Sequence, residues 1–344
     1  MKYLILLLLS FSCSSFLLAE DPVNCSTAFQ KGLESIDYYT TKHGGTLRYA
    51  FFESPVKNTP KKTFVFIQGR CTFIEFYEVM VLPLLERGFD VWTYDLTGQG
   101  GSSRILSEEK HDSLSIQYLQ HMDDFGTYVE DIHSFLLDIV FPNTQGKLVL
   151  GGYSTGGHLA LRYAQSHPET SLESIFVISP LIKMKTPIPP CFLHSLFSGA
   201  SWIMHLERYV PGAGHEEPIY HMAFEGNPYS GDKEGFNDIV ALCTQYPALM
   251  MGGASMGWVK AALKSVNDLW KRQAIESIQV PVLIATGGED GVVDITNNGR
   301  FAKKLKHAKH VYYPEGRHEL FRETDGIKAA LWKDFDQFQK NIPN

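Results

Sequence analysis

This chain of 344 residues lacks an excess of basic residues and, beyond its first twenty residues, any long apolar run. It carries 31 Lys and Arg against 38 Asp and Glu, which gives a formal net charge of -7 and a pI near 6.0. This balance argues against nucleic-acid binding and against docking onto anionic lipid by charge alone. No later segment has the apolar length that a membrane span needs. The composition therefore predicts a globular protein, either one large domain or a domain with an insertion.

The first nineteen residues differ from the rest of the chain. Lys2 precedes the apolar residues 4–9, a zone of small residues follows, and Leu17-Leu-Ala19 stands before the acidic Glu20. This order is typical of an export signal, with cleavage expected after Ala19. Lipoprotein modification at Cys13, or an apolar strand or anchor helix, are the alternatives. We therefore expect an exported protein, periplasmic or secreted, that a lipid at Cys13 could anchor to a membrane.

Cysteine is scarce. Without the one in the predicted signal, four remain, an even number that permits two disulfides in an oxidising compartment and allows three pairings. The alternative is that some of them are small buried apolar residues. The four are Cys25, Cys71, Cys191 and Cys243.

Short apolar segments alternate with amphipathic ones along most of the chain. Strand composition is found at 46–52, 63–67, 89–94, 148–150, 174–179, 280–285 and 309–313. Helical spacing is found at 76–87, 116–140, 158–165, 296–305 and 326–341. The alternation predicts an α/β fold, with a mostly parallel central sheet covered by helices on both faces. Residues 20–45 are polar, and we expect them to form a surface lead-in.

The alternation stops between Leu181 and Ile275, and this stretch predicts an inserted helical cap. We place the α/β core at 20–182 and 273–344 and the cap at 183–272, with cap helices at 194–209 and 257–270. The aromatic and methionine side chains form the cap's own core or, alternatively, a flexible surface that lines a site for an acyl chain. Such a surface could also touch a membrane transiently. The stretch holds six of the nine methionines: Met184, Met204, Met222, Met250, Met251 and Met256.

A serine turn joins the predicted strand at Leu148 to the following helix. The sequence Gly152-Tyr-Ser154-Thr-Gly156 has the pattern Gly-x-Ser-x-Gly of a nucleophile elbow. In such an elbow the glycines let backbone segments approach closely, and the strained turn lifts the serine hydroxyl clear of the sheet. The alternative is a glycine turn that serves packing alone. We predict that Ser154 is a nucleophile.

A serine hydroxyl needs a base, normally a histidine that a carboxylate orients. Asp290 follows the strand at 280–285 and His318 follows the strand at 309–313, so both stand at carboxyl ends of predicted parallel strands. We assign Asp290 as the acid and His318 as the base. Glu289 and Asp294 are rivals for the acid, although Asp294 is also placed to cap the helix that starts near 296. His158, the histidine closest to Ser154 in sequence, is expected to point away and pack in the core.

When the serine attacks a carbonyl group, the carbonyl oxygen becomes an oxyanion, which needs hydrogen-bond donors already in place. We expect the backbone amides of Thr155, just after the nucleophile, and of Arg70, in the loop after the strand at 63–67. An ordinary glycine turn is the alternative for that loop. The spacing of His215 and His221, interrupted by Pro218, does not fit a two-histidine helical metal site. We therefore predict neither a metal nor a cofactor.

Several of these segments together resemble a known family. Gln68-Gly-Arg, Asp95-Leu-Thr-Gly-Gln-Gly, Gly152-Tyr-Ser-Thr-Gly-Gly and Gly288-Glu-Asp-Gly-Val-Val-Asp294 resemble α/β-hydrolases of the lysophospholipase and monoacylglycerol lipase group. Asn227-Pro-Tyr-Ser-Gly-Asp232, followed by Gly257-Trp258, resembles the cap motif of that group. The resemblance implies an α/β-hydrolase fold and carries the nucleophile, acid and base onto Ser154, Asp290 and His318, and the oxyanion amides onto Arg70 and Thr155. The chain departs from the pattern at Gln68, where many relatives have His, and at Thr97, where Arg is common.

These observations predict a serine hydrolase that cleaves the carboxylic ester of single-chain lipids through an acyl-enzyme, as a lysophospholipase or monoacylglycerol lipase does. A broad-specificity carboxylesterase for small esters keeps the same three residues and is the first alternative. A lipid-binding protein with a vestigial site is the second. Transfer of the acyl group to an alcohol instead of water is compatible with the same residues.

Overall fold

The computed structural model describes residues 25–57, 61–106, 118–144, 146–186, 206–215 and 222–342. Eight strands form one sheet: β1 (Asp37–Thr40), β2 (Thr46–Phe52), β3 (Lys62–Ile67), β4 (Phe89–Tyr94), β5 (Leu148–Tyr153), β6 (Leu172–Ile178), β7 (Val282–Gly287) and β8 (Ala308–Tyr313). Their spatial order is β1-β2-β4-β3-β5-β6-β7-β8. β2 runs antiparallel to both of its neighbours, and the other neighbouring pairs are parallel. The prediction of a mostly parallel sheet is confirmed.

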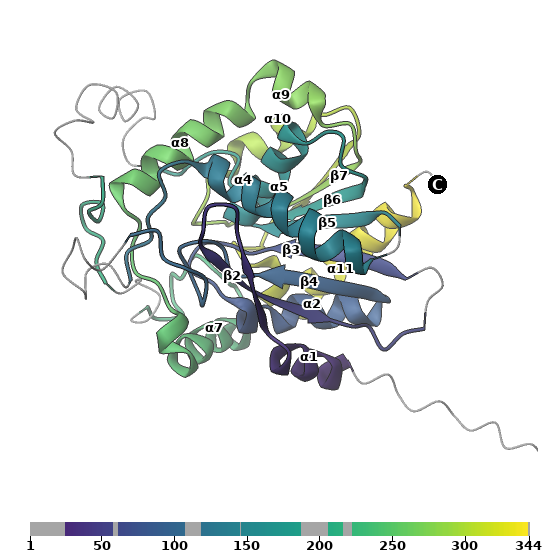
Figure 1. Cartoon of the computed structure of the whole chain (residues 1–344), viewed down its shortest axis with the longest axis horizontal. Coiled ribbons are helices and arrows are strands. Elements are labelled where there is room, and N and C mark those ends of the chain that lie inside the picture. The colour runs from purple at the N-terminus through teal and green to yellow at the C-terminus, as the bar shows by residue number, and fades with distance from the viewer. Residues whose placement is uncertain are drawn as a thin grey trace, which may run out of the picture.

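Helices surround this sheet (Figure 1). They are α1 (Cys25–Glu34), α2 (Glu78–Glu86), α4 (Phe125–Phe135), α5 (Thr155–Ser166), α7 (Lys233–Gln245), α8 (Met256–Leu269), α9 (Arg272–Ser277), α10 (Asn298–Ala302) and α11 (Asp325–Lys340). Three of them, α7, α8 and α9, lie in the insertion between β6 and β7. Among the described residues, no helix combines the length and apolar character of a membrane span.

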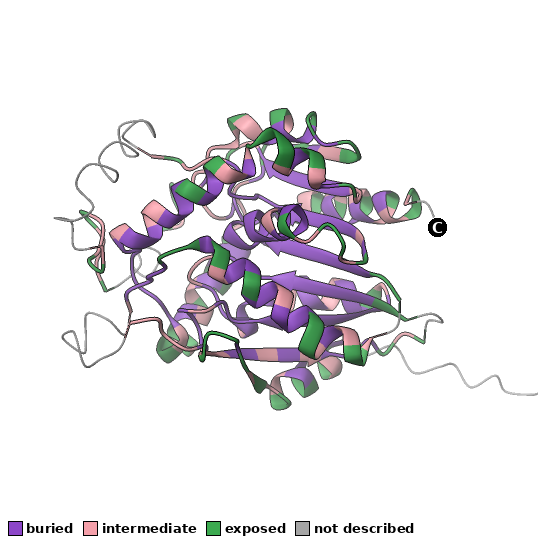
Figure 2. Cartoon of the chain, turned by 45° about the horizontal axis from the view of Figure 1, so that its top comes forward, coloured by how far each residue is buried: buried purple, intermediate pink, exposed green. Residues whose placement is uncertain are grey.

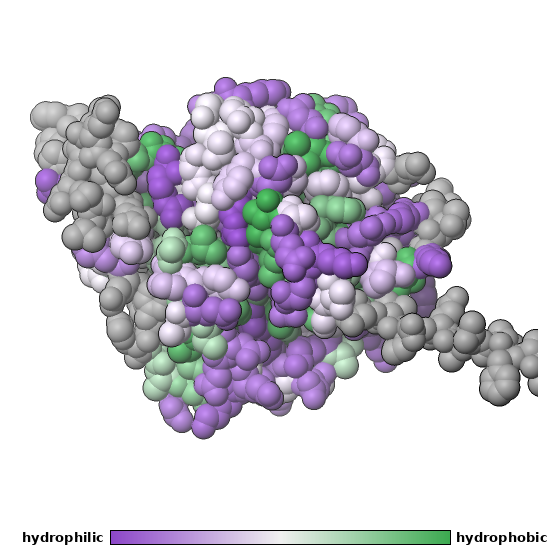
Figure 3. Space-filling model, turned by 60° about the horizontal axis from the view of Figure 1, so that its bottom comes forward, coloured by the Kyte–Doolittle hydropathy of each residue, from purple (hydrophilic) through white to green (hydrophobic). Residues whose placement is uncertain are grey.

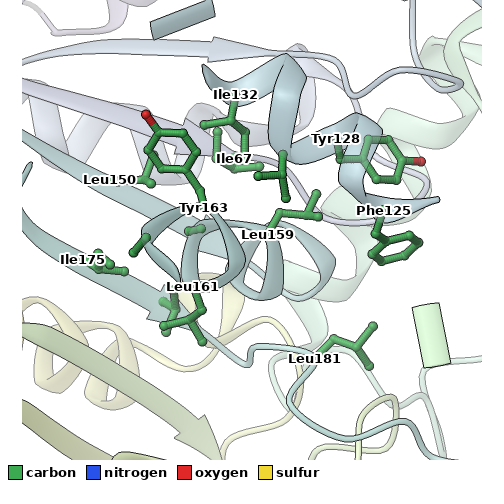
Figure 4. Close-up of a cluster of buried hydrophobic side chains, with 14 of the residues drawn as sticks. Ile67, Phe125, Tyr128, Ile132, Leu150, Leu159, Leu161, Tyr163, Ile175 and Leu181 are labelled. Atoms are coloured by element: carbon green, nitrogen blue, oxygen red, sulfur yellow. The ribbon is translucent and has the colours of Figure 1, made fainter. Parts of the chain in front are cut away.

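The strands β3 to β7 are buried on both faces of the sheet (Figure 2). Successive side chains of a strand point to opposite sides, so each face packs into its own cluster. On β3, Val65 packs into one apolar cluster with residues of α4 and α5, while Phe64 packs into another with residues of α2 and α11. Figure 4 shows part of the first cluster, with Leu159 of α5 and Ile132 of α4 close to Ile67 at the end of β3. On the face of the molecule drawn in Figure 3, by contrast, hydrophilic and hydrophobic residues of the described chain are interspersed. The close packing of the sheet makes it a rigid base for the loops at the ends of its strands.

The prediction of one helix over 116–140 is wrong at its start. Helix α4 begins at Phe125, where the Asp124 carboxylate caps it by accepting a hydrogen bond from the Gly126 amide. Upstream, Gln120 forms a β-bridge with Ala254 in the insertion. Met122 is buried in the core although it is not helical, so its helical spacing reflected burial and not helix. Residues 116 and 117 lie outside the described residues.

The polar lead-in is also more ordered than predicted, because it contains α1 and β1. Phe29 of α1 is buried and stacks on Phe52 of β2 with ring centroids 4.9 Å apart. The helix expected over 296–305 is shorter, since α10 ends at Ala302 after a 3-10 turn. Most of the cap helix expected at 194–209 lies outside the described residues, and its end is a turn in which Tyr209 pairs with Ser255.

The three described cysteines, Cys25, Cys71 and Cys243, are not joined to one another, and Cys25 and Cys243 are buried free thiols. Cys191, the fourth cysteine after the predicted signal, can pair with only one of these three. Two disulfides would therefore also require a bond between the other two. The arrangement with two disulfides is therefore not formed. Cys191 lies outside the described residues.

Candidate active site

The turn at Ser154 has the geometry of a nucleophile elbow. Ser154 joins β5 to α5 with φ at 54°, a backbone conformation in which residues other than glycine are strained. A Cβ at Gly152 would lie 2.4 Å from the Gly156 carbonyl oxygen, and a Cβ at Gly156 would lie 2.1 Å from that of Ile67. Both glycines are therefore required by close backbone contacts, one within the turn and one to β3. The Ser154 amide donates to the Ile178 carbonyl at 2.9 Å, which fastens the turn to β6.

Ser154, His318 and Asp290 form a chain of hydrogen bonds. His318 Nε2 lies 2.9 Å from Ser154 Oγ, and His318 Nδ1 lies 2.7 Å from Asp290 Oδ2. The other oxygen of Asp290 accepts hydrogen bonds from the amides of Val292 at 2.8 Å and Val293 at 3.0 Å. All three hydrogen-bonded residues are buried. A carboxylate held in this way fixes the imidazole with one nitrogen toward the serine.

The rival residues have other partners. Asp294 accepts from the Thr296 amide at 3.0 Å and forms an ion pair with Lys183 at 2.6 Å, so its role as a helix cap is confirmed. Glu289 points toward Arg317, 3.9 Å away. His158 is fully buried and lies 2.9 Å from the Leu181 carbonyl. Burial lowers the pKa of His158 to about 3, so this residue stays neutral and packs in the core as predicted.

A turn of the insertion supports the loop that carries the histidine. The amide of His318 donates to the carbonyl of Pro228 at 3.3 Å, and the next amide, of Glu319, donates to the carbonyl of Tyr229 at 2.8 Å. The Pro228 ring also packs on Gly291 so closely that a Cβ there would lie 2.5 Å from Pro228 Cβ. The insertion therefore touches both the loop of His318 and the loop of Asp290.

Asn227 holds this turn in shape. Its Oδ1 accepts from the amides of Tyr229 and Ser230, both at 2.9 Å, and its Nδ2 donates to the carbonyls of Phe224 at 2.7 Å and Ser230 at 3.0 Å. The side chain is buried, and these four bonds use its whole hydrogen-bonding capacity. Sequence reasoning noted the motif at 227–232 only as a resemblance and missed this supporting role.

The loop of Arg70 is held on both sides of that residue. The Gly69 amide donates to the Tyr77 hydroxyl at 2.8 Å, and the Cys71 amide donates to Gln99 Oε1 at 3.2 Å. Gln99 also donates through Nε2 to the Gly69 carbonyl at 2.8 Å. Gln99 belongs to the motif that starts at Asp95, and this bracing role was not foreseen from the sequence. The loop is therefore fixed beside the serine turn, as a preorganised set of donors requires.

These residues surround a cavity of about 230 Å³. Ser154, Thr155, Arg70 and His318 all line it, so four of the five predicted site residues share one space and Asp290 lies behind His318. The whole lining consists of Arg70, Cys71, Thr72, Phe76, Tyr153, Ser154, Thr155, Leu181, Met184, Lys185, Tyr229, Ile239, Cys243, Met250, Trp258, Val292, Val293, His318 and Glu319. Of the six methionines in the insertion, Met184 and Met250 are therefore in the described wall. The buried Glu319 was not predicted, because nothing in its local sequence separates it from a surface residue.

The two departures from the family pattern, Gln68 and Thr97, lie outside the cavity lining. Gln68 is fully buried, and its Nε2 lies 3.4 Å from Thr93 Oγ1. Thr97 donates to Asp131 at 2.6 Å. Within the described residues, no group of three His, Cys, Asp or Glu side chains is arranged to hold a metal ion, and residues 216–221 of the pattern that starts at His215 lie outside them.

Comparison with known proteins places this site in a family. Residues 58–325 match the Hydrolase_4 family, described as serine aminopeptidase, S33. The chain is 23% identical to a probable lysophospholipase L2 of Haemophilus influenzae, over 88% of this chain and 90% of that protein. It is 22% identical to lysophospholipase L2 of Escherichia coli K12, over 80% of each.

Among solved structures, a soluble variant of monoglyceride lipase from Saccharomyces cerevisiae in complex with a substrate analogue superimposes with a TM-score of 0.65. It is 16% identical, and the match covers 90% of this chain and 96% of that one. This likeness establishes the α/β-hydrolase fold, which agrees with the sheet order and with the prediction. The expectation of an ester hydrolase agrees with the relatives. The chain is similar to lysophospholipases and has the fold of a monoglyceride lipase, and it belongs to the Hydrolase_4 family of serine hydrolases.

Proposed function

We propose that this protein hydrolyses the carboxylic ester of a single-chain lipid, a lysophospholipid or a monoacylglycerol, with Ser154 as nucleophile, His318 as general base and Asp290 as orienting acid. One observation carries the proposal: the hydrogen-bond chain from Ser154 Oγ through His318 to Asp290, at 2.9 and 2.7 Å, in the wall of a cavity. A serine becomes nucleophilic at neutral pH when a base so placed can take its proton.

The reaction runs in two steps. Ser154 Oγ attacks the ester carbonyl carbon while His318 Nε2 takes the hydroxyl proton, and the carbonyl oxygen becomes an oxyanion that the amides of Arg70 and Thr155 stabilise. His318 then gives its proton to the departing alcohol, which leaves an acyl group on Ser154. Water, activated by His318, attacks this ester and releases the fatty acid. Asp290 keeps the imidazole oriented and stabilises its charged form throughout.

The choice of a lipid substrate rests on the cavity wall and on the relatives. Apolar side chains, including Leu181, Met184, Met250 and Val292, surround the serine and suit an acyl chain. Similarity to proteins named lysophospholipase and monoglyceride lipase points the same way. A small-ester carboxylesterase is the second candidate, favoured by the modest cavity volume of about 230 Å³.

Location is a separate part of the proposal. The order of residue types over residues 1–19 supports export, with cleavage after Ala19 or lipidation at Cys13. These residues lie outside the described chain. An exported enzyme of this kind would meet its substrate at a membrane surface, and we propose that the insertion makes this transient contact.

The function is tested by hydrolysis of lysophospholipids, monoacylglycerols and short nitrophenyl esters by the wild type and by Ser154→Ala. The wild type is expected to cleave the single-chain lipids, and Ser154→Ala to lose all ester hydrolysis and all labelling by a fluorophosphonate while unfolding at the same temperature. Cleavage of the short esters alone would favour the carboxylesterase. Binding of lipid without cleavage of any ester would indicate a vestigial site.

A further inference from the structure

The peptide bond between Gly69 and Arg70 is held at its carbonyl end. The Arg70 amide is one of the two proposed oxyanion donors, and the carbonyl of the same peptide belongs to Gly69. Gln99 Nε2 donates to this carbonyl oxygen at 2.8 Å, and Thr72 Oγ1 donates to it at 3.0 Å. A trans peptide is planar, so its C=O and N–H point in opposite directions. The two donors on the Gly69 oxygen therefore fix the direction of the Arg70 N–H.

The side chain of Gln99 is itself fixed in one orientation. It is fully buried, and Nε2 also donates to the Thr72 carbonyl at 3.1 Å. Its Oε1 accepts from the Cys71 amide at 3.2 Å and from Gln120 Nε2 at 2.8 Å. Together with the bond to Gly69, these contacts use both amide protons and both lone pairs. Gln99 does not line the cavity, so any effect on the reaction must pass through these partners.

Thr72 belongs to a closed ring of hydrogen bonds. The Gly69 amide donates to the Tyr77 hydroxyl at 2.8 Å, and that hydroxyl lies 2.8 Å from Thr72 Oγ1. Because the Thr72 proton is used on the Gly69 oxygen, Tyr77 is the donor in this contact. Burial raises the pKa of Tyr77, which keeps its hydroxyl protonated for that role. The ring therefore holds both the amide and the carbonyl of Gly69.

A second contact ties the two loops together without Gln99. Asp95 begins the loop that carries Gln99, and it accepts from the Ile74 amide at 2.9 Å and the Gly101 amide at 2.8 Å. Arg48 Nη1 donates to the same carboxylate at 2.9 Å, and both side chains are buried. A substitution at Gln99 should therefore leave the loops in place while it frees the Gly69 carbonyl to turn.

We propose that Gln99 is a positioning residue that orients the Gly69–Arg70 peptide so that its N–H meets the oxyanion, with Thr72 as the second donor that holds this orientation. This inference rests on the proposed function, because it concerns the oxyanion of ester cleavage. Hydrogen bonds to the carbonyl also polarise the peptide, which strengthens the N–H as a donor. The benefit arises when the ester oxygen becomes charged, so it acts on kcat and little on the binding of the uncharged ester.

The test uses monolauroylglycerol as the ester and dodecyl trifluoromethyl ketone as a probe of the oxyanion, both below their micelle concentrations. Ser154 Oγ bonds to the ketone carbon, the π electrons of the carbonyl move to its oxygen, and His318 takes the serine proton. The inhibitor therefore carries the charged oxygen that the substrate carries only in transit. Active sites are counted from the end point of fluorophosphonate labelling, so that unfolded protein does not enter kcat.

Gln99→Met removes the donor to the Gly69 carbonyl at a similar side-chain length. Its kcat should fall by about 10 to 100-fold with little change in KM, because losing an oxyanion donor outright costs about 10² to 10³-fold and a misdirected donor should cost less. The inhibition constant of the ketone should rise by a similar factor, since the same charged oxygen loses the same donor.

Two variants of Thr72 provide a second, independent pair. Thr72→Val should lower kcat in the same way by a smaller factor, and Thr72→Ser, which keeps the hydroxyl, should retain most of the wild-type kcat. Gln165→Met is the matched control, because Gln165 is also buried and donates Nε2 to a backbone carbonyl, that of Leu269 at 2.9 Å. Gln165 does not line the cavity, so this variant should keep the wild-type kcat and inhibition constant.

Several results would overturn the proposal. They are a wild-type kcat in Gln99→Met, a change confined to KM, or a lower kcat with unchanged inhibition by the ketone. If Gln99→Met yielded no countable active sites, the Thr72 pair would decide, and equal kcat values in its two variants would overturn the proposal as well. A wild type that neither cleaves the ester nor binds the ketone would instead refute the proposed function.

Discussion

The sheet core and the insertion contribute to the site in different ways. The core places the side chains of the proposed chemistry: Ser154 after β5, Asp290 after β7 and His318 after β8, all at the carboxyl ends of parallel strands. The insertion contributes a turn that bonds to the main chain of the His318 loop, and part of the cavity wall. In the proposed mechanism the core supplies the reactive groups, while the insertion supports the His318 loop and contributes part of the cavity wall. Substitutions confined to one region or the other separate these two contributions.

The largest effect is expected from the acid in the core. Asp290→Asn removes the charge that orients and stabilises His318, and catalytic efficiency should fall by about 10⁴-fold, by analogy with other triads. Asp294→Asn is the matched control, because Asp294 caps a turn and pairs with Lys183 without touching His318. Steady-state kinetics on one ester measure both. If Asp294→Asn were the crippled variant, the acid would be misassigned.

The contact between core and insertion at His158 should make stability depend on pH. His158 lies between the Leu181 carbonyl and Ser265 of α8, and Arg162 and Asp268 are the charged groups that act on it. Its pKa is lowered from 6.5 to about 3, so the stability due to the neutral form is present above pH 6.5 and is lost as the pH falls toward 3. At pH 4.5 the loss should be about 3 kcal/mol.

Urea unfolding of the wild type and of His158→Asn at pH 8 and pH 4.5 checks this prediction. The variant should be less stable at pH 8 because it loses packing and hydrogen bonds, but it should lose less stability on acidification than the wild type. Equal losses on acidification in the two proteins would show that His158 is not the titrating group.

A smaller effect on catalysis is expected from the turn of the insertion. Asn227→Ala removes the four hydrogen bonds that shape residues 227–230 and should let the His318 loop shift. Because a misplacement of about 1 Å can cost 10²-fold in rate, kcat should fall by about 10 to 100-fold with little change in KM. Asn237→Ala, on the exposed side of α7, is the control with the same substitution in the same insertion.

The pH profile of kcat should also change in Asn227→Ala, since the environment of the base has moved. A variant with normal kcat and a normal pH profile, but lower thermal stability, would reduce the turn to a structural element.

The smallest effect concerns the cavity wall. Catalytic efficiency should rise with acyl length from four to sixteen carbons, because each buried methylene contributes about 0.8 kcal/mol at most. Met184→Ala and Met250→Ala should each reduce the preference for twelve over four carbons by a few fold, since both side chains line the cavity. Met251→Ala is the control, because Met251 is buried outside the cavity lining. A flat profile in the wild type would favour the small-ester enzyme.

The difference between core and insertion also explains which parts of the site could be predicted from the sequence alone. The serine elbow is a local feature, in which Gly152, Ser154 and Gly156 stand at fixed spacing between a strand and a helix, so its geometry could be predicted. Asp290 and His318 could be placed because each follows a predicted strand of a parallel sheet. Their distances to Ser154 required the structure, since they depend on the packing of three separate loops.

What escaped prediction was determined by contacts between distant residues. Helix α1 was missed because its local sequence is mostly polar. Its one aromatic residue, Phe29, is buried only by packing on Phe52, more than twenty residues away. Met122 kept a helical spacing without being in a helix. The role of Asn227 was missed because the turn that it shapes bonds to the His318 loop across the boundary between core and insertion, and turns carry no periodicity that would indicate such bonds.

If the elbow serine of the core is the nucleophile and His318 activates it, one labelling experiment should show both roles. The most direct measurement is to label the protein with a fluorophosphonate, digest it, and locate the adduct by mass spectrometry, with His318→Ala labelled in parallel. We predict one adduct, on Ser154, and labelling slowed by orders of magnitude in His318→Ala. An adduct on another serine would rule out Ser154 as the nucleophile, and labelling at the same rate without His318 would rule out His318 as its base.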